Sequence, residues 1–472
     1  MQFHCIPSAL AALFHTFEGC FTVPGFRHFV PLMTGWLLVR GPHTISRVLQ
    51  IARRLGRSGH HASAYRFLSH GRWSLDAVGR VVLGLFRPWL PQRVLAVVDD
   101  TLCAKSGRQL FGVGIHHDAT LSTYRRDGCR IDVCRPGHCW VVLAVYVPCP
   151  WDSSRGWAIP VLFRLYRPPG RCPAASYRKR SELAAELIEL VGSWLEDRRI
   201  DVTGDGAYCC KTVIRTLPEQ VRFVGPLPLD AALYESASRP SSRRGRPRRK
   251  GYRVASPRAR LAQHKGWEEV EIVLYGRPVR VRLFTCVCVW YPSAGTSPVR
   301  VVITRDRRGL RDGRAYVSTD PDLSAKEVLA TYARRWLLEV SFRDIKQELG
   351  FEDPRNGWWR RPPGRRDDTC RRPLRRLGST KGKLAVEHTA PLAAVAYALA
   401  VRWYLEKGRP ALDIARARRR APWNRHKRSV SFIDMLAALR IEILRYQFRR
   451  MRPAARIRRI SERLSEMAGI AA

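Results

Sequence analysis

The feature that most constrains the fold is an uninterrupted apolar run that ends in two acids. Residues 94–101 read ValLeuAlaValValAspAspThr. Apolar and β-branched side chains at successive positions, without polar alternation, are typical of a strand that is buried on both faces. Such strands occur where helices cover both sides of a sheet, so the run predicts an α/β fold.

Further apolar runs predict strands over 140–147, 158–166, 200–208 and 221–226. Among them, residues 181–195 carry apolar side chains at helical spacing and begin at a Ser N-cap. Strands that are interrupted by a helix in this order favour a mixed α/β sheet with helices on its faces.

The charge balance indicates a polyanionic partner. The 472 residues include 84 Lys and Arg against 40 Asp and Glu, a formal net charge of +44. Each phosphate that such a surface neutralises releases a condensed counterion, so nucleic acid is the partner we expect. The charge is spread along the chain, and an arginine-rich composition without a specific cause is the alternative.

Cysteine usage and hydropathy argue against two classes of protein. The 13 cysteines include no Cys-x-x-Cys pair, which is typical of free thiols in a reducing cytosol. Cys134, His138 and Cys139 lie close together, but a closed zinc site needs a fourth ligand and no further pair is nearby. Without a long apolar run or a secretion signal, we expect a soluble, cytoplasmic protein that does not span a membrane.

The N-terminal segment is predicted to be helical. Apolar residues recur at helical spacing over 45–52 and 75–86, on either side of a turn at 56–61. Two helices around a tight turn in a basic segment fit a helix-turn-helix DNA reader. A helical packing domain without DNA contacts explains the pattern equally well.

Residues 229–318 change to an alternating pattern, which predicts a β-rich insertion. Strands over 269–275 and 279–289 should pair as a hairpin around a GlyArgPro turn, and a third strand covers 299–304.

A basic tract at 243–250 precedes these strands. Its ArgGlyArgPro core places Arg244 and Arg246 on either side of a glycine, an arrangement that can enter a narrow minor groove of DNA. Both arginines are therefore candidate DNA contacts. A flexible basic linker is the alternative.

A long helix is predicted over 325–349. Tyr332, Arg335, Glu339 and Lys346 stand at offsets of 0, 3, 7 and 14 and fall within an arc of roughly 60°. An apolar stripe beside them is the expected core face: Leu338, Phe342, Ile345 and Leu349. An acid between two cations suits a metal-bound phosphate, and a solvated face with charge pairs is the alternative.

Two further acids follow buried strands. Asp100 ends the first strand, and Asp205 stands in a Gly-Asp-Gly turn directly after another. Rigid strands fix such side chains and leave room for a substrate beyond them, although a single Asp at such a position is more often a turn former. Asp99 adjoins Asp100, and neighbouring strand residues point to opposite faces, so only one of the two can join a site.

These residues together resemble bacterial insertion-sequence transposases of the DDE superfamily. The spacing of the Tyr, Arg, Glu and Lys residues matches the signature of one subgroup. The segment 97–101 is similar to the family's first-acid motif, and 204–208 is similar to its second. The resemblance covers about residues 25–410 and implies a ribonuclease H-like core with a β-rich insertion between the second and third acids.

The resemblance also implies a catalytic centre. Asp100, Asp205 and Glu339 would be the catalytic acids and would hold two Mg²⁺ or Mn²⁺ ions. Asp100 is preferred to Asp99 because the acid next to Thr matches the motif.

DNA contacts are implied in the same way. In such relatives the signature residues, here Tyr332, Arg335 and Lys346, contact the backbone of the transposon end. Some relatives that form hairpins stack a flipped base on a Trp of the insertion, and Trp267 and Trp290 are the candidates in this sequence.

The implied activity is DNA transposition in the bacterial nucleoid. A homodimer in a synaptic complex would cleave the transposon ends and join their 3′-OH groups to target DNA. A nuclease without strand transfer and a domesticated or inactive DNA-binding protein are the alternatives. The predicted domains are a helical DNA-binding domain (1–88), the first part of the catalytic domain (89–228), the β-rich insertion (229–318), the remainder of the catalytic domain with the Glu-bearing helix (319–410), and a basic helical C-terminal region (411–472).

Overall fold

The chain divides into a helical unit and a sheet unit. The structure, a computed structural model, describes residues 6–54, 60–105, 110–118, 120–124, 129–237, 249–263, 265–274, 277–305, 313–354 and 380–450. The helical unit comprises residues 1–81, 344–355 and 388–472, and the sheet unit comprises residues 82–343 and 356–387. Each unit therefore contains segments that are far apart in the sequence.

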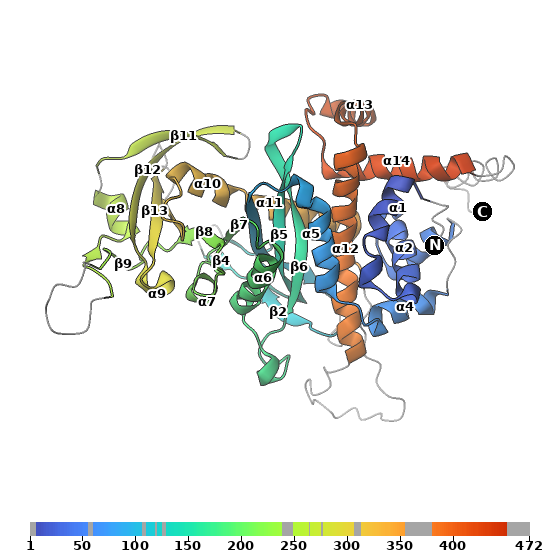
Figure 1. Cartoon of the computed structure of the whole chain (residues 1–472), viewed down its shortest axis with the longest axis horizontal. Coiled ribbons are helices and arrows are strands. Elements are labelled where there is room, and N and C mark those ends of the chain that lie inside the picture. The colour runs from blue at the N-terminus through green and yellow to red at the C-terminus, as the bar shows by residue number, and fades with distance from the viewer. Residues whose placement is uncertain are drawn as a thin grey trace. The chain divides into compact units, whose positions relative to one another are not determined.

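One mixed sheet forms the sheet unit (Figure 1). Its strands are β1 (Arg93–Ala104), β2 (Gly114–His117), β5 (Cys134–Cys149), β6 (Asp152–Tyr166), β7 (Arg199–Gly204), β8 (Val221–Leu227), β9 (Leu233–Tyr234), β10 (Arg253–Val254), β11 (Glu268–Leu274), β12 (Arg277–Val289), β13 (Pro298–Arg305) and β14 (Arg314–Ser318). They are ordered β10-β9-β12-β13-β14-β8-β7-β1-β5-β2, with β11 paired to β12 and β6 paired to β5. A separate pair is formed by β3 (Thr123–Tyr124) and β4 (Arg130–Ile131).

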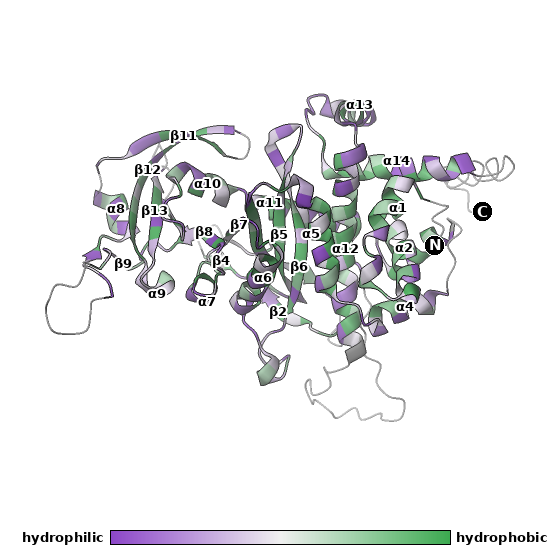
Figure 2. Ribbon diagram, viewed as in Figure 1, coloured by the Kyte–Doolittle hydropathy of each residue, from purple (hydrophilic) through white to green (hydrophobic). Residues whose placement is uncertain are grey.

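The central strands follow from the apolar runs. β1 lies between β5, to which it is antiparallel, and β7, to which it is parallel. Residues 94–98 of β1 and 139–147 of β5 are buried, and these strands are coloured mainly hydrophobic in Figure 2. The helices α6 (Arg180–Trp194) and α11 (Trp336–Leu349) pack against these strands. The prediction of a mixed α/β sheet with helices is confirmed.

The predicted N-cap of α6 is wrong by two residues. Lys179 occupies the cap position, and its backbone N–H donates to the carboxylate of Glu182 at 2.8 Å. The helix therefore begins before Ser181, because the acid in its first turn supplies the capping interaction.

The predicted hairpin of the insertion is confirmed, since β11 and β12 pair as antiparallel strands. These strands do not form a separate layer. β12, β13, β14 and β8 pair in succession, so the insertion continues the same sheet. Short helices border it: α7 (Lys211–Ile214), α8 (Pro257–Gln263) and α9 (Tyr291–Ala294).

The long helix predicted over 325–349 is two helices. α10 (Ala325–Ala333) ends before Arg334, and α11 begins at Trp336. At the junction the N–H of Arg335 donates to the carbonyl of Tyr332 at 3.0 Å, and the N–H of Leu338 donates to that of Arg335 at 3.1 Å. These bonds span three residues rather than four, so the backbone tightens between the two helices.

Glycine ends α11. Gly350 has a φ of +60°, which a residue with a Cβ rarely adopts, and the N–H of Phe351 donates back to the carbonyl of Ile345 at 3.3 Å. A Cβ at Gly350 would also meet a carboxylate oxygen of Asp353 at 2.3 Å.

The helical unit contains more helices than the sequence predicted. Its described helices are α1 (Ser8–His15), α2 (Val23–Leu38), α3 (Ile45–Arg54), α4 (His61–His70), most of α5 (Leu75–Phe86), most of α12 (Thr380–Lys407), α13 (Pro410–Arg420) and α14 (Phe432–Arg450). α4 was not predicted, and it lies between the two helices expected around the turn at 56–61. Most of that turn lies outside the described residues.

One described helix passes the length and composition test for a membrane span. This segment, Gly382–Lys407 of α12, has 89% of its most apolar window buried inside the structure. Such burial is typical of a core helix. Charged residues such as Lys383, Glu387 and Arg402 interrupt this segment, so its sequence does not form one long apolar run.

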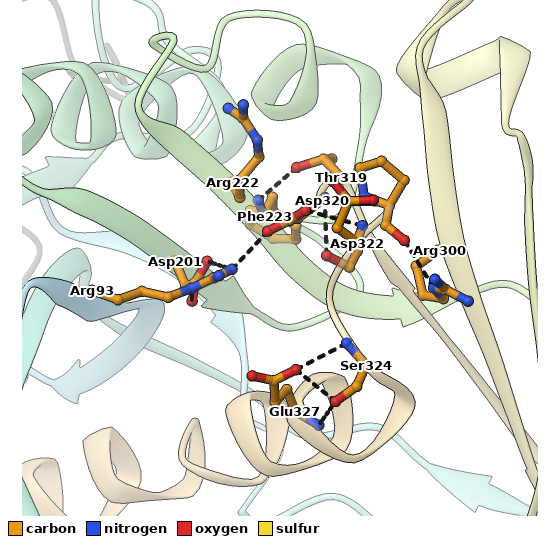
Figure 3. A network of polar contacts seen from close by, with 12 residues as sticks. Arg93, Asp201, Arg222, Phe223, Arg300, Thr319, Asp320, Asp322, Ser324 and Glu327 are labelled. Atoms are coloured by element: carbon orange, nitrogen blue, oxygen red, sulfur yellow. Dashed lines mark hydrogen bonds and ion pairs between the residues drawn. The ribbon is translucent and has the colours of Figure 1, made fainter.

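Arg93 joins the sheet to the loop that leads into α10 (Figure 3). Its guanidinium donates to Asp201 at 2.9 Å and to Asp320 at 2.8 Å. The hydroxyl of Thr319 accepts from the N–H of Phe223 at 2.8 Å, which fixes the same loop to β8. The start of α10 is therefore held to β1, β7 and β8 by charged and polar contacts.

We expect Arg93→Ala to lower the free energy of unfolding by about 1–3 kcal/mol, because two carboxylates then lose a charged hydrogen bond. Urea denaturation of both proteins measures the change. Arg199→Ala, which removes an exposed arginine of β7, is the control and should stay within about 0.5 kcal/mol of the wild type. An equal loss in the two variants would contradict the role of the Arg93 contacts.

Candidate active site

The sheet brings Asp99, Asp100 and Asp205 to the same region. β7 ends at Gly204, so Asp205 follows it directly, and Val98 of β1 lies opposite Gly204 in the parallel register. Asp205 accepts a hydrogen bond at 2.9 Å from the N–H of Ala207, which fixes its carboxylate in the turn.

Asp99 and Glu339 are joined by Arg335. The guanidinium of Arg335 donates to Asp99 at 2.7 Å through one nitrogen and pairs with Glu339 at 2.6 Å through the other. Val97, two residues before Asp99, packs in a cluster with Leu338 of α11. Since side chains two apart on a strand share a face, Asp99 points toward the helix that carries Glu339.

Asp100 points to the other face of β1. Its carboxylate accepts from the guanidinium of Arg180 at 3.1 Å and from the hydroxyl of Tyr208 at 2.8 Å. The thiol of Cys139 donates to it at 3.3 Å. Asp100 is therefore held by side chains of α6, β5 and the turn after β7.

The acids influence one another electrostatically. The pKa of Asp99 is raised to about 7, chiefly by burial; Arg335 opposes this rise, and the nearby charges of Asp205 and Asp100 contribute to it. Burial also raises the pKa of Asp205, and the charge of Asp100 adds to that rise. A cation placed among these acids would stabilise their ionised forms.

The other two signature residues, Tyr332 and Lys346, make different contacts. The ring of Tyr332 packs against that of Tyr316 with centroids 4.9 Å apart, and the guanidinium of Arg335 lies 6.0 Å from the Tyr332 ring. Lys346 instead forms an ion pair with Glu352 at 3.0 Å within the helical unit. The structure thus links Tyr332 and Arg335 to Glu339, and engages Lys346 elsewhere.

Some of the remaining candidate DNA contacts lie outside the described residues. Arg244 and Arg246 lie outside the described residues, as does most of the basic loop at 354–383. Trp290 is only 6% exposed, so its ring is packed inside the sheet unit, whereas Trp267 is half-buried.

Sequence reasoning missed Arg180 and Tyr208. Tyr208 belongs to the GlyAspGlyAlaTyr segment, which already signalled Asp205. Arg180 carried no such signal, because its contact with Asp100 joins residues that are 80 positions apart.

The donor chemistry of the acids fits a hard divalent cation, because carboxylate oxygens are its preferred ligands. In the described part of the chain, no group of three or more His, Cys, Asp or Glu side chains is arranged to hold a metal ion. The positive charge between Asp99 and Glu339 is instead the guanidinium of Arg335. The zinc alternative gains no support, since His138 bonds the carbonyl of Phe111 at 2.8 Å.

Comparisons with known proteins give one family. A family model described as DDE superfamily endonuclease matches residues 16–280, which include Asp99, Asp100 and Asp205. The chain is also similar to a piggyBac transposase solved in a synaptic complex with hairpin DNA, at 10% identity over 97% of this chain and 81% of that chain. The TM-score of 0.37 is too low to compare the two folds. No curated protein matches the chain.

We expect stability in EDTA to depend on pH through Asp99. Its folded pKa of about 7 lies above the ordinary value of 3.8, so the folded state binds this proton more tightly and loses stability as pH rises toward 7. The asparagine of Asp99→Asn cannot lose a proton in this range. The free energy of unfolding of Asp99→Asn, relative to that of the wild type, should therefore rise by about 2–4 kcal/mol from pH 4 to pH 8.

Urea denaturation at several pH values measures this difference. The control, Asp322→Asn, changes an exposed aspartate on the loop before α10 and should follow the wild-type pH profile. If the difference in the free energy of unfolding between Asp99→Asn and the wild type stays the same at every pH, burial does not raise the pKa of Asp99.

Proposed function

Because the chain belongs to the DDE superfamily of endonucleases, we propose that it is a DNA transposase that cuts transposon ends and joins them to target DNA. The proposal rests on one observation: the fold brings together acids that come from three different elements. Arg335 links Asp99 of β1 to Glu339 of α11, and Asp205 follows the neighbouring strand β7.

A ribonuclease H-like catalytic core is part of the proposal. Support comes from the mixed sheet, in which two acids stand on β1 and one directly after the parallel strand β7. The strands between the second and third acids extend this sheet, as expected of an insertion in one domain.

We choose between the two acids of β1 as the metal ligand by the direction in which each side chain points. The motif favours Asp100, whereas the geometry favours Asp99, because only Asp99 faces the helix that carries Glu339. Asp99, Asp205 and Glu339 would then hold the divalent ions, Mg²⁺ or Mn²⁺. When bound, two such ions activate water at a phosphodiester and stabilise the leaving 3′ oxygen.

Asp100 then has a different part in the site. Its bonds to Tyr208 and Arg180 connect β1 with the turn after β7 and with α6. Tyr208 lies three residues after Asp205, and its N–H donates to the carbonyl of Asp205 at 3.2 Å. Asp100 would thereby position the turn that carries Asp205.

Arg335 would change partners when DNA binds. Its planar guanidinium now neutralises Asp99 and Glu339, and it suits a phosphate as well as it suits a carboxylate. Divalent cations at the two acids would release the guanidinium to hold the phosphodiester of the DNA strand. Tyr332 supports this arginine, because the guanidinium lies over its ring.

The net charge of +44 supports DNA as the partner. We further propose that Lys346, Arg244 and Arg246 contact the DNA backbone, that the active form is a homodimer, and that the protein is a bacterial insertion-sequence transposase of the Tyr-Arg-Glu-Lys subgroup that acts in the nucleoid. A nuclease without strand transfer is the second candidate, since the family model describes an endonuclease.

We expect Asp99→Asn, Asp205→Asn and Glu339→Gln each to reduce Mg²⁺-dependent cleavage of a transposon-end duplex by about 100-fold or more, because several kcal/mol of transition-state stabilisation is lost. The binding of the uncleaved duplex in Ca²⁺ should change little. Single-turnover cleavage and gel-shift assays measure the two effects.

Asp100→Asn completes this comparison. If Asp99→Asn retains cleavage while Asp100→Asn abolishes it, the assignment by direction is wrong and the assignment by motif is right. Full cleavage by Asp205→Asn or Glu339→Gln would remove that residue from the proposed site. Appearance of cut ends without joined products would favour the nuclease.

We expect Arg335→Gln to bind Mn²⁺ about tenfold more tightly than the wild type in the absence of DNA, because the competing positive charge is gone. Electron paramagnetic resonance of free Mn²⁺ measures the affinity. Arg334→Gln is the matched control, since the guanidinium of Arg334 lies over the ring of Tyr146 rather than on a carboxylate. Equal affinities in all three proteins would show that Arg335 does not compete with the metal.

A further inference from the structure

The turn between α13 and α14 in the helical unit concentrates positive charge. No Asp or Glu occurs between Asp413 and Asp434. The same interval holds seven cationic side chains: Arg416, Arg418, Arg419, Arg420, Arg425, Lys427 and Arg428. We call residues 416–428 the basic turn. It includes the short 3₁₀ helix η4 (Pro422–Asn424).

Hydrogen bonds hold the basic turn in a defined shape. The guanidinium of Arg418 donates twice to the carbonyl of Lys427, at 2.6 and 3.0 Å. The N–H of Asn424 donates to the carbonyl of Ala421 at 2.8 Å. These contacts close the loop on itself, so the turn presents its outer side chains from a fixed backbone.

The acids at the two ends of this interval are already used inside the unit. Asp413 is 5% exposed and accepts from the hydroxyl of Tyr404 at 2.8 Å and from Arg416 at 3.1 Å. Asp434 is also 5% exposed and pairs with Lys427 at 2.7 Å. Neither carboxylate is left to neutralise the outer arginines.

The outer arginines therefore keep their charge uncompensated. Arg419, Arg420, Arg425 and Arg428 are exposed, and no carboxylate of the described residues pairs with them. An array of exposed guanidinium groups on a rigid turn suits a polyanion with regularly spaced phosphates.

Trp423 stands among these arginines. It is 85% exposed, the most open of the large apolar side chains in the described part of the chain. An indole in this position offers a flat face to a ligand, and Trp beside Arg is the combination that stacks unpaired nucleic acid bases.

We propose that the basic turn is a second DNA-binding surface that recognises the junction between duplex and unpaired DNA. The arginines hold the backbone phosphates, and Trp423 stacks on an unpaired base. This inference deepens the proposed transposase function, because strand cleavage and joining produce ends with unpaired nucleotides.

An anionic membrane is the competing partner, since Trp and Arg also favour lipid interfaces. An interfacial helix needs an apolar face, and α13 ends in Arg418, Arg419 and Arg420 at successive positions around its axis. These three positions span about 200° around the axis, so the exposed side of this helix end is charged rather than apolar, which favours DNA.

The test uses the full-length protein in EDTA, so that cleavage does not interfere. Fluorescence anisotropy compares a blunt duplex with the same duplex carrying a short single-stranded extension. We expect Trp423→Ala to weaken binding of the extended probe by about 5- to 100-fold, because one stacked base contributes about 1–3 kcal/mol. Binding of the blunt duplex should change less than twofold, and Trp423→Phe should restore most of the loss.

Two further variants complete the experiment. Trp151→Ala, which removes a 41% exposed Trp between β5 and β6, is the control and should bind both probes as the wild type does. Arg419→Ala should weaken binding of both probes and reduce the slope of log affinity against log salt by about 0.9.

The outcomes separate this inference from the proposed function. If the wild type binds DNA and Trp423→Ala binds each probe as tightly as the wild type does, the second surface is refuted and the transposase proposal stands. The same proteins are also tested for binding to phosphatidylserine vesicles. If Trp423→Ala loses vesicle binding and keeps its binding to both DNA probes, the basic turn is a membrane surface and the inference is overturned. The expected loss with Trp423→Ala, together with full cleavage by Asp205→Asn, would support the surface and refute the catalytic site.

Discussion

The contact of Arg335 with Asp99 and Glu339 is the interaction on which the arrangement of the site depends. Two carboxylates that are brought together in a partly buried position repel each other unless a cation lies between them. Arg335 provides that cation, and it stands at the junction where α10 ends and α11 begins. The same charge thus relieves the repulsion and holds the helix against β1.

The alternation of side chains along β1 divides the site into two parts. Asp99 faces α11 and Glu339, while Asp100 faces Arg180 and Tyr208. Asp99 is thereby available to the metal site that we propose, and Asp100 is committed to bonds with α6 and the turn after β7. The motif favours Asp100, but the two acids adjoin one another in sequence, and only the directions of their side chains show which of them faces Glu339.

The two units differ in how far their charged side chains are paired with opposite charges. In the sheet unit, the charged residues near the acids are paired with one another, as Arg335 is with Asp99 and Glu339. In the helical unit, the outer arginines of the basic turn pair with no described carboxylate, and Trp423 is exposed. The basic turn therefore places positive charge where a ligand can neutralise it, which is the arrangement that favours binding to a polyanion.

The sequence by itself determined the mixed sheet, the hairpin of the insertion and the acids near the strand ends. These features depend on local patterns: continuous apolar runs, alternation and turn residues. Periodicity did not reveal the break between α10 and α11, because Arg334 and Arg335 suit a helix as well as they suit a junction. Only the tertiary structure decided that Asp99 rather than Asp100 faces Glu339, and that Lys346 pairs with Glu352. The direction of a side chain depends on which helix packs against each face of the strand, and that packing joins residues more than 200 positions apart.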